Sequence, residues 1–132
     1  MPIPSSRLIL SASAFLLAGL GLAALFAPGD SAMVLGFDAR AAEALALVAP
    51  GLLGMAGLNW VGRGVRLDGL YGRPLSVANF LTGGVGASTL ARLETEMPGD
   101  PAGWVLVGLL ALYTVIFAWY LFAPPDSDPT AP

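Results

Sequence analysis

The sequence predicts an all-α fold, a bundle of four transmembrane helices that run up, down, up and down. Hydrophobic residues make up 56% of the chain and charged residues only 11%, whereas a soluble domain carries about a quarter charged residues. Four long segments have no charged residue: 8–27, 44–62, 74–91 and 101–123. Each approaches or exceeds the roughly 20 residues that a helix needs to cross a bilayer. Their apolar residues do not alternate as in barrel strands, so we expect helices.

The first helix is expected at about 7–27, because Pro28-Gly29-Asp30 cannot continue it. The beginning of the chain resembles a secretory signal, with one basic residue before an apolar run. That run is 20 residues long, longer than the roughly 7–15 apolar residues of a signal. We therefore expect a retained helix. The segment 31–41 is apolar enough to lie on the membrane surface or to dock against the bundle.

The second and third helices are expected at about 42–62 and 74–92, with Pro74 in the first turn of the third. Glycines recur along the second helix, and one face of the third is polar and small. Small residues let helix backbones approach closely in lipid, so we expect these two helices to pack together. The glycines of the second helix are Gly51, Gly54 and Gly57, and the face of the third helix comprises Ser76, Asn79, Thr82, Gly83, Gly86 and Thr89.

The fourth helix is expected at about 102–122, after the turn at 98–101. Trp104 at one end and Trp119 and Tyr120 at the other are expected to anchor it at the two membrane surfaces. Tyr113 lies in the middle and needs a hydrogen-bond acceptor. We expect one domain, 1–123, followed by a disordered, acidic and proline-rich tail at 124–132.

The loop between the second and third helices contains three of the six basic residues, Arg63, Arg66 and Arg73. A fourth arginine, near the N-terminus, lies on the same side of the predicted bundle, and the opposite side has two. Short arginine-rich loops stay in the cytoplasm, so we predict that both termini are cytoplasmic. We expect the three loop arginines to fix this topology and to contact anionic lipid headgroups.

Two asparagines flank the arginine loop. At about 1.5 Å per residue, Asn59 and Asn79 lie roughly 6 and 9 Å inside the same membrane surface. Because amides are costly in hydrocarbon, we expect the two to bond to each other between the helices. One alternative is a site for a polar ligand or ion that also includes Tyr71, Arg73 and Thr82. In a second alternative, the two amides do not bond to each other and simply extend to the membrane–water interface.

Several residue types that carry chemistry are missing. The chain has no cysteine and no histidine, which removes thiolate nucleophiles, the usual haem ligand and the usual proton shuttle near neutral pH. No Ser-His-Asp, paired-carboxylate or metal-ligand pattern is present, so we expect no catalytic residue, no metal and no cofactor. A net charge of -3 argues against a nucleic-acid partner.

The layout resembles that of small uncharacterised bacterial membrane proteins with four helices. The shared features are a proline that ends the first helix, Leu-Gly before the second, a GLLGxxxLNW segment and an asparagine early in the third helix. Many members carry a histidine after that asparagine, which this chain lacks. The resemblance implies a four-helix membrane protein and supplies no activity. The matching residues are Pro28, Leu35-Gly36, Gly51 to Gly54, Leu58-Asn59-Trp60 and Asn79.

The leading hypothesis is a non-enzymatic, multi-pass protein of the bacterial inner membrane that contacts lipids. It would be an accessory or structural subunit that packs through small-residue helix faces in a homo-oligomer or a larger membrane complex. The alternative is a small transporter or channel with a polar path lined by the third helix. An enzyme ranks third, because the carboxylates cluster in loops.

Overall fold

The computed structural model describes residues 5–38, 40–96 and 101–122, and the regular structure of these residues is helical. The long helices begin and end within two residues of the expected positions, except that the third continues to Glu96. The predicted tail at 124–132 lies outside the described residues. The elements are α1 (Ser6–Phe26), α2 (Pro28–Val34), α3 (Ala41–Val61), a 3-10 turn (Gly62–Gly64), α4 (Arg73–Glu96) and α5 (Pro101–Phe122).

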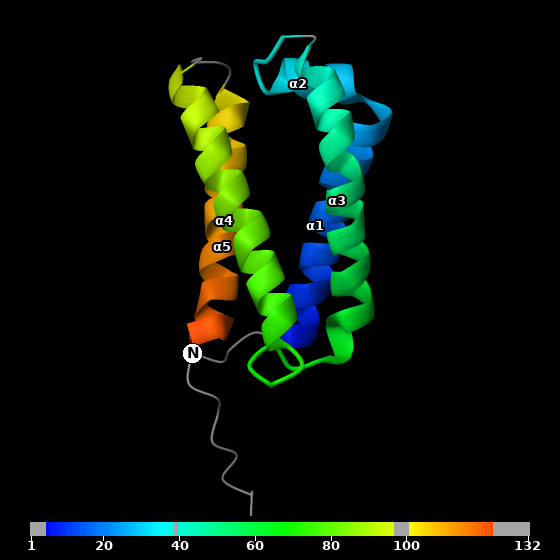
Figure 1. The fold of residues 1–132 in the computed structure, drawn as a ribbon, viewed down its shortest axis with the longest axis vertical. Helices are drawn as coiled ribbons and strands as arrows, with labels where there is room; N and C mark the ends of the chain where they lie inside the picture. Colours follow the sequence, from blue (N-terminus) through cyan, green and yellow to red (C-terminus); the bar gives the residue numbers. More distant parts are fainter. Residues whose placement is uncertain (1–4, 39, 97–100, 123–132) are drawn as a thin grey trace, which may run out of the picture.

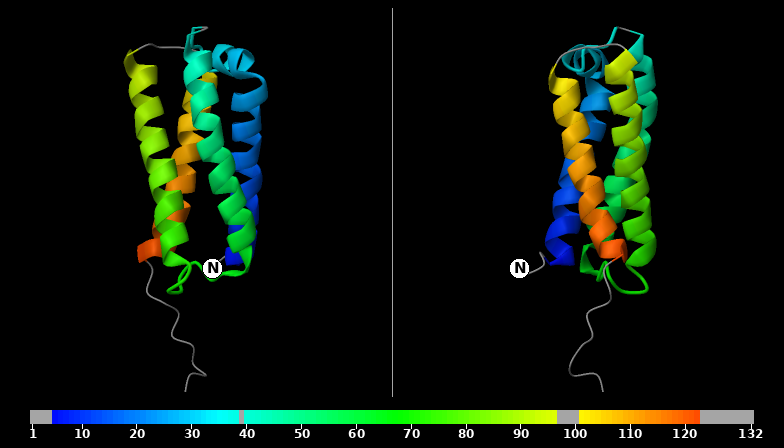
Figure 2. Two further views of the ribbon diagram at one scale, coloured as in Figure 1. Left: turned by 45° about the vertical axis from the view of Figure 1, so that its right-hand side comes forward. Right: turned by 90° about the vertical axis from the view of Figure 1, so that its left-hand side faces the viewer.

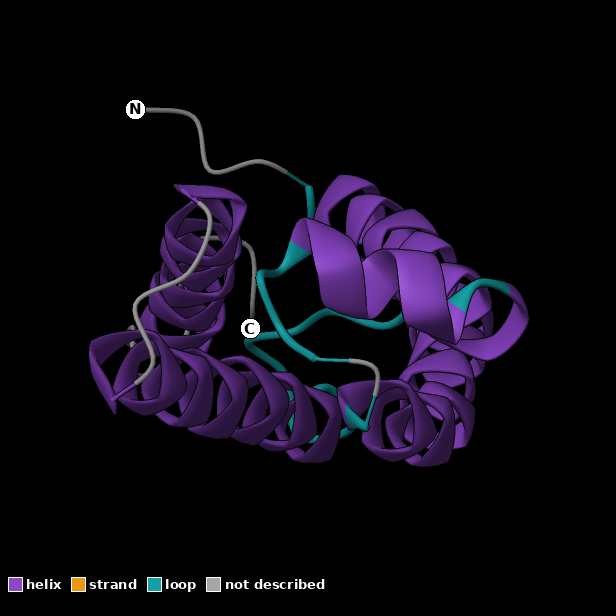
Figure 3. Cartoon of the chain, turned by 90° about the horizontal axis from the view of Figure 1, so that it is seen from above, coloured by secondary structure: helices purple, strands orange, loops and turns teal. Residues whose placement is uncertain are grey.

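The four long helices form two pairs, α1 with α3 and α4 with α5 (Figure 1). Successive long helices run in opposite directions, and the short helix α2 lies at the end of the bundle opposite the 62–72 loop (Figure 2). Seen along the bundle, the two pairs stand beside each other (Figure 3). The helices α3 and α4, although consecutive, make few close backbone contacts. Side chains therefore join the pairs.

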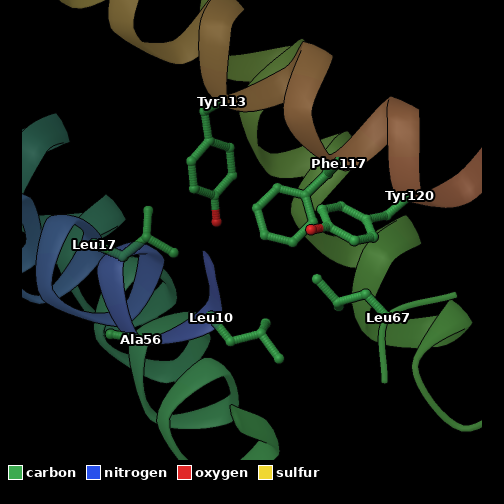
Figure 4. Packing of buried hydrophobic residues seen from close by; sticks show 7 residues of the cluster. All are labelled: Leu10, Leu17, Ala56, Leu67, Tyr113, Phe117 and Tyr120. Carbon is green, nitrogen blue, oxygen red and sulfur yellow. The ribbon is translucent and has the colours of Figure 1, made fainter. Parts of the chain in front are cut away.

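The hydrophobic core lies between the pairs, in the half of the bundle near the 62–72 loop. Phe117 of α5 and Leu10 and Leu17 of α1 are fully buried there. Figure 4 shows the α5 side chains directed toward those of α1 and toward Leu67 of the loop. In lipid the gain comes from close packing of these side chains and not from removal of water, because lipid tails are equally apolar. This contact holds the α4–α5 pair against α1.

Three helices are long and apolar enough to cross a membrane: Ser6–Phe26, Ala41–Gly64 and Pro101–Phe122. Large apolar side chains also point outward along them, including Leu47 and Val61, each 82% exposed. Such a surface suits hydrocarbon and not water. The chain is a multi-pass membrane protein whose helices contact lipid. The helix α4 is not among the three, because polar and small residues lower the hydropathy even of its charge-free segment 74–91. A fourth crossing stays a prediction.

The small residues face different neighbours from those we expected. A Cβ at Gly21 of α1 would lie 2.9 Å from Leu53 Cγ of α3, and a Cβ at Gly83 of α4 would lie 2.6 Å from Thr114 Oγ1 of α5. The expected packing of α3 on α4 through glycine is therefore wrong. The close approaches lie within the two pairs, since those backbones run side by side. A Cβ would have no neighbour within 4 Å at any of three α3 glycines, Gly51, Gly54 and Gly57.

The aromatic residues of α5 divide into two groups. Trp104 and Trp119 are 49% and 63% exposed, as interfacial anchors would be. Tyr120 was expected to act with them, and that expectation is wrong, because its side chain is only 7% exposed and belongs to the core cluster with Phe117 and Leu67. Its position one residue after Trp119 turns it toward the neighbouring helices.

Candidate functional site

Asn59 and Asn79 meet inside the bundle, each with no exposed surface. Asn59 Nδ2 donates to Asn79 Oδ1 at 2.8 Å, and Asn79 Nδ2 donates back to Asn59 Oδ1 at 2.7 Å. Asn59 lies in the last turn of α3 and Asn79 in the second turn of α4. The short loop between the helices brings the two positions to similar depth. The expected amide pair is present, although the two backbones separate beyond it.

Tyr113 of α5 joins the amide pair. Its hydroxyl donates to Asn79 Oδ1 and accepts a bond from Asn59 Nδ2 at 3.4 Å. Ser13, buried on α1, lines a cavity together with Tyr113. The second N–H of Asn79 donates to the backbone carbonyl of Leu75 at 2.8 Å. We call Asn59, Asn79 and Tyr113 the polar network, and α3, α4 and α5 each supply one of its members.

The polar network is saturated with internal bonds. Both amide oxygens accept bonds, both amide nitrogens donate them, and the Tyr113 hydroxyl does both. Buried polar groups with partners are stabilising, whereas each group left without one costs about 1–3 kcal/mol. Because every polar group of the network already has a partner, a polar ligand would have to displace one of these internal bonds. The network also contains no charged group. The arrangement is suited to holding α3, α4 and α5 together.

Three residues of the predicted cluster lie elsewhere. Tyr71 is 86% exposed and Arg73 is exposed, so neither joins the buried amide pair. They precede or begin α4 at the end of the bundle, where nearness in sequence does not direct side chains inward. The Thr82 hydroxyl donates to the Ala78 carbonyl of its own helix at 2.8 Å. Tyr113, for which the sequence required only some acceptor, takes their place.

The predicted topology arginines have local partners. Arg63 Nη1 donates to the Trp60 carbonyl at 2.6 Å, and its guanidinium stands 4.0 Å from the centre of the Trp60 ring. Arg66 forms an ion pair with Asp68 at 2.9 Å. The hydrogen bond from Arg66 lowers the pKa of the Asp68 carboxyl below its ordinary value. The contacts of Arg63 and Arg66 lie at the loop end of the bundle.

The 62–72 loop is part of the fold. Leu67 is fully buried, although it stands between Arg66 and Asp68. Its backbone N–H donates to Ser6 Oγ at 3.1 Å, and its carbonyl accepts from Ser76 Oγ at 3.2 Å. No sequence pattern predicts this burial, because a lone leucine in a charged loop has no periodicity. The loop connects the start of α1 to the start of α4.

A cavity of about 140 Å³ lies between α1 and α5, beside the polar network. Its walls are apolar side chains such as Leu16, Leu112 and Ile116, and Ser13 and Tyr113 form its polar edge. No residue of α4 lines it. The hydroxyls of Ser76 and Thr82 bond to backbone carbonyls, and Thr89 is exposed, so these residues do not line a shared path.

Comparison with models of protein families, with curated proteins and with solved structures finds no match. The resemblance to small bacterial four-helix membrane proteins therefore stays a prediction. A helical, multi-pass membrane protein with a saturated polar network is what the structure establishes.

Proposed function

We propose that the protein is a non-enzymatic subunit of the membrane that packs against other transmembrane helices through one face of α3. Its partners are further copies of the chain or the helices of a larger membrane complex. The observation that supports this is a row of exposed residues on α3 with successive spacings of four and three. We call this row the α3 outer stripe: Leu47, Gly51, Gly54, Leu58 and Val61.

The composition of the α3 outer stripe favours a helix over lipid as its neighbour. The spacing of four and three is the one by which two helices pack along a common seam. Large apolar residues lie at its ends, where Leu47 and Val61 are each 82% exposed, and glycines occupy its centre. A glycine inside a helix costs about 0.5–1 kcal/mol relative to alanine and gains nothing against lipid tails. Against another helix it permits close approach.

We propose that α4 is the fourth membrane span. Its 24 residues give a length of about 36 Å at 1.5 Å per residue, enough for a hydrocarbon core of about 30 Å. The polar Ser76 and Asn79 face the bundle, whereas Val77, Leu81 and Val85 are 39%, 52% and 61% exposed on the outer side. A helix with its polar groups inside and its apolar groups outside suits lipid even when its average composition is moderate.

Four spans would place both termini on the same side as the arginine-rich 62–72 loop, which we assign to the cytoplasm. The membrane would be the inner membrane of a bacterium, since outer-membrane spans are barrel strands. The alternative function, a transporter with a path along α4, has weaker support, because the α4 hydroxyls bond to backbone carbonyls.

The oligomeric state tests the proposed role. Native mass spectrometry in mild detergent should show the wild-type protein with further copies or with a second membrane protein. Gly51→Leu/Gly54→Leu should reduce it to a monomer. Gly19→Leu/Gly108→Leu is the matched control, because those glycines of α1 and α5 also have no neighbour within 4 Å. A wild-type protein that is always a lone monomer would contradict the proposal.

The topology can be tested without first removing any cysteine, because the chain has none. Leu70→Cys lies in the loop and Met33→Cys in α2, at positions that are 79% and 74% exposed in the native protein. A membrane-impermeant maleimide added to intact cells should label Met33→Cys and spare Leu70→Cys. Both should react after the cells are lysed. The reverse pattern would show that the orientation is inverted. Labelling of both variants in intact cells would show that the loop and α2 do not lie on opposite sides of the membrane.

A further inference from the structure

The cavity between α1 and α5 opens to the outside of the bundle. Its inner wall includes Tyr113 and Phe117, which are buried and point from α5 toward α1 (Figure 4). Its outer rim includes Ala12 of α1 and Leu109 and Leu112 of α5, which are exposed. A molecule outside the bundle can therefore enter between these rim residues. We call this space the α1–α5 cavity.

The depth of the α1–α5 cavity places it beside lipid tails. Both α1 and α5 are long and apolar enough to cross a membrane. The first residue of α1, Ser6, bonds to the 62–72 loop at the end of the bundle. At about 1.5 Å per residue, Ile9 and Leu16 of the cavity wall lie roughly 5 and 15 Å from Ser6. In a hydrocarbon core of about 30 Å, the cavity therefore lies within the leaflet nearer the loop.

The walls of the α1–α5 cavity favour hydrocarbon over water. A buried water molecule needs about two to four polar partners, and the only polar side chains of the walls are Ser13 and Tyr113. The Tyr113 hydroxyl already bonds to both asparagines of the polar network. The cavity volume is about 140 Å³, and an apolar cavity of about 150 Å³ stays dry and binds benzene or xenon. The space therefore suits a short length of hydrocarbon.

We propose that the α1–α5 cavity binds one acyl chain of a membrane phospholipid. The cavity is continuous with the apolar surface by which α1 and α5 contact lipid, and acyl chains are the hydrocarbon at that depth. An empty cavity would leave its walls without partner atoms on one side and forfeit their dispersion contacts.

The bound chain would contact both helix pairs, because α1 belongs to one pair and α5 to the other. A ligand that binds only the folded protein stabilises it, so the phospholipid should strengthen the contact between the pairs. This inference goes beyond the proposed packing through the α3 outer stripe and does not depend on it, since no residue of α3 lines the cavity.

The isoleucines of the chain provide NMR probes on both walls of the cavity. There are three, and two of them, Ile9 of α1 and Ile116 of α5, line the cavity. The full chain with ¹³C-labelled isoleucine methyl groups, in deuterated detergent, is titrated with dioleoylphosphatidylglycerol. The variants Ile9→Val and Ile116→Val assign the two signals.

Both methyl signals should shift together, reach saturation, and show nuclear Overhauser effects to acyl-chain protons. Signals that do not change, or that change without saturating as for ordinary boundary lipid, would overturn the proposal. A second titration adds geranylgeraniol, an isoprenoid alcohol, to the lipid-saturated protein. If an equal amount of it displaced the phospholipid from both methyl groups, the assignment to an acyl chain would be wrong.

A variant that fills the cavity locates the bound chain. Ala12→Phe adds a ring at the rim, so the saturable change at Ile116 should be lost. The matched control is Ala111→Phe, because Ala111 is exposed on α5 but does not line the cavity. This control should respond to the phospholipid as the wild type does. A saturable change that persisted in Ala12→Phe would place the lipid elsewhere and contradict the proposal.

Thermal unfolding of the wild type provides a measurement that needs no variant. Its melting temperature should rise as dioleoylphosphatidylglycerol is added, over the same concentration range in which the methyl signals saturate. A melting temperature that does not respond to the phospholipid would also contradict the proposal.

Discussion

Two polar sites are buried in this bundle, one toward each end, and they differ in how their hydrogen bonds are satisfied. Toward the 62–72 loop, Asn59 and Asn79 bond to each other and to Tyr113. Toward the α2 end, Glu94 is equally buried but neither of its oxygens has a partner among the described residues. The first site stabilises the assembled helices, whereas the second makes one contact costly. The difference shows that burial stabilises a polar group only where its hydrogen bonds are satisfied.

The largest effect should come from breaking the saturated site. Asn79→Leu leaves the Asn59 amide and the Tyr113 hydroxyl without their partner, and we expect the free energy of unfolding to fall by about 2–4 kcal/mol. Titration with sodium dodecyl sulfate in mixed micelles measures it. The control is Asn59→Leu/Asn79→Leu, which removes both amides and should cost less than the sum of the single variants. A single variant as stable as the wild type would show that the network is not stabilising.

At the α2 end, we expect removal of the buried polar group to raise the free energy of unfolding. Glu94→Met replaces an unpartnered carboxyl with an apolar side chain of similar length, so we expect stability to rise by about 1–2 kcal/mol. The same micelle titration applies. Glu96→Met, at the exposed neighbouring position, should stay within about 0.5 kcal/mol of the wild type. If Glu94→Met were strongly destabilising, the carboxyl would have a favourable partner, and the contrast between the two sites would fail.

The smallest effect is expected for the Tyr113 hydroxyl, whose contribution to stability can be measured apart from that of the amide pair. Tyr113→Phe removes one hydroxyl and keeps both bonds between the asparagines, so a loss of about 0.5–1.5 kcal/mol is expected. Unfolding in mixed micelles at several protein concentrations would measure it without interference from association. A loss as large as that of Asn79→Leu would make the hydroxyl, and not the amide pair, the centre of the network.

Much of the fold followed from elementary patterns. Charge-free runs and proline breakers located the long helices, and the depth of Asn59 and Asn79 below the loop predicted their contact. Depth is readable from sequence because each residue adds a fixed rise along a helix. Tyr113 needed an acceptor in the middle of its span, and the acceptor is Asn79.

The sequence did not predict which helices pack against each other. A glycine shows that a close approach is possible but not which helix approaches, and Gly83 faces α5 where α3 was expected. Tyr71 and Arg73 lie near Asn79 in sequence but point away from it, since the loop ends there. The burial of Leu67 and Glu94 depends on contacts distant along the chain or in space, for which neither residue carries a local signal.

The hydrogen bonds of Leu67 bear on how the protein is made. They involve Ser6 and Ser76 only, and both of these residues precede α5 in the chain. The first three long helices can therefore be tied together at the loop while the last is still emerging. Tyr113, the third member of the polar network, belongs to the last helix to be synthesised.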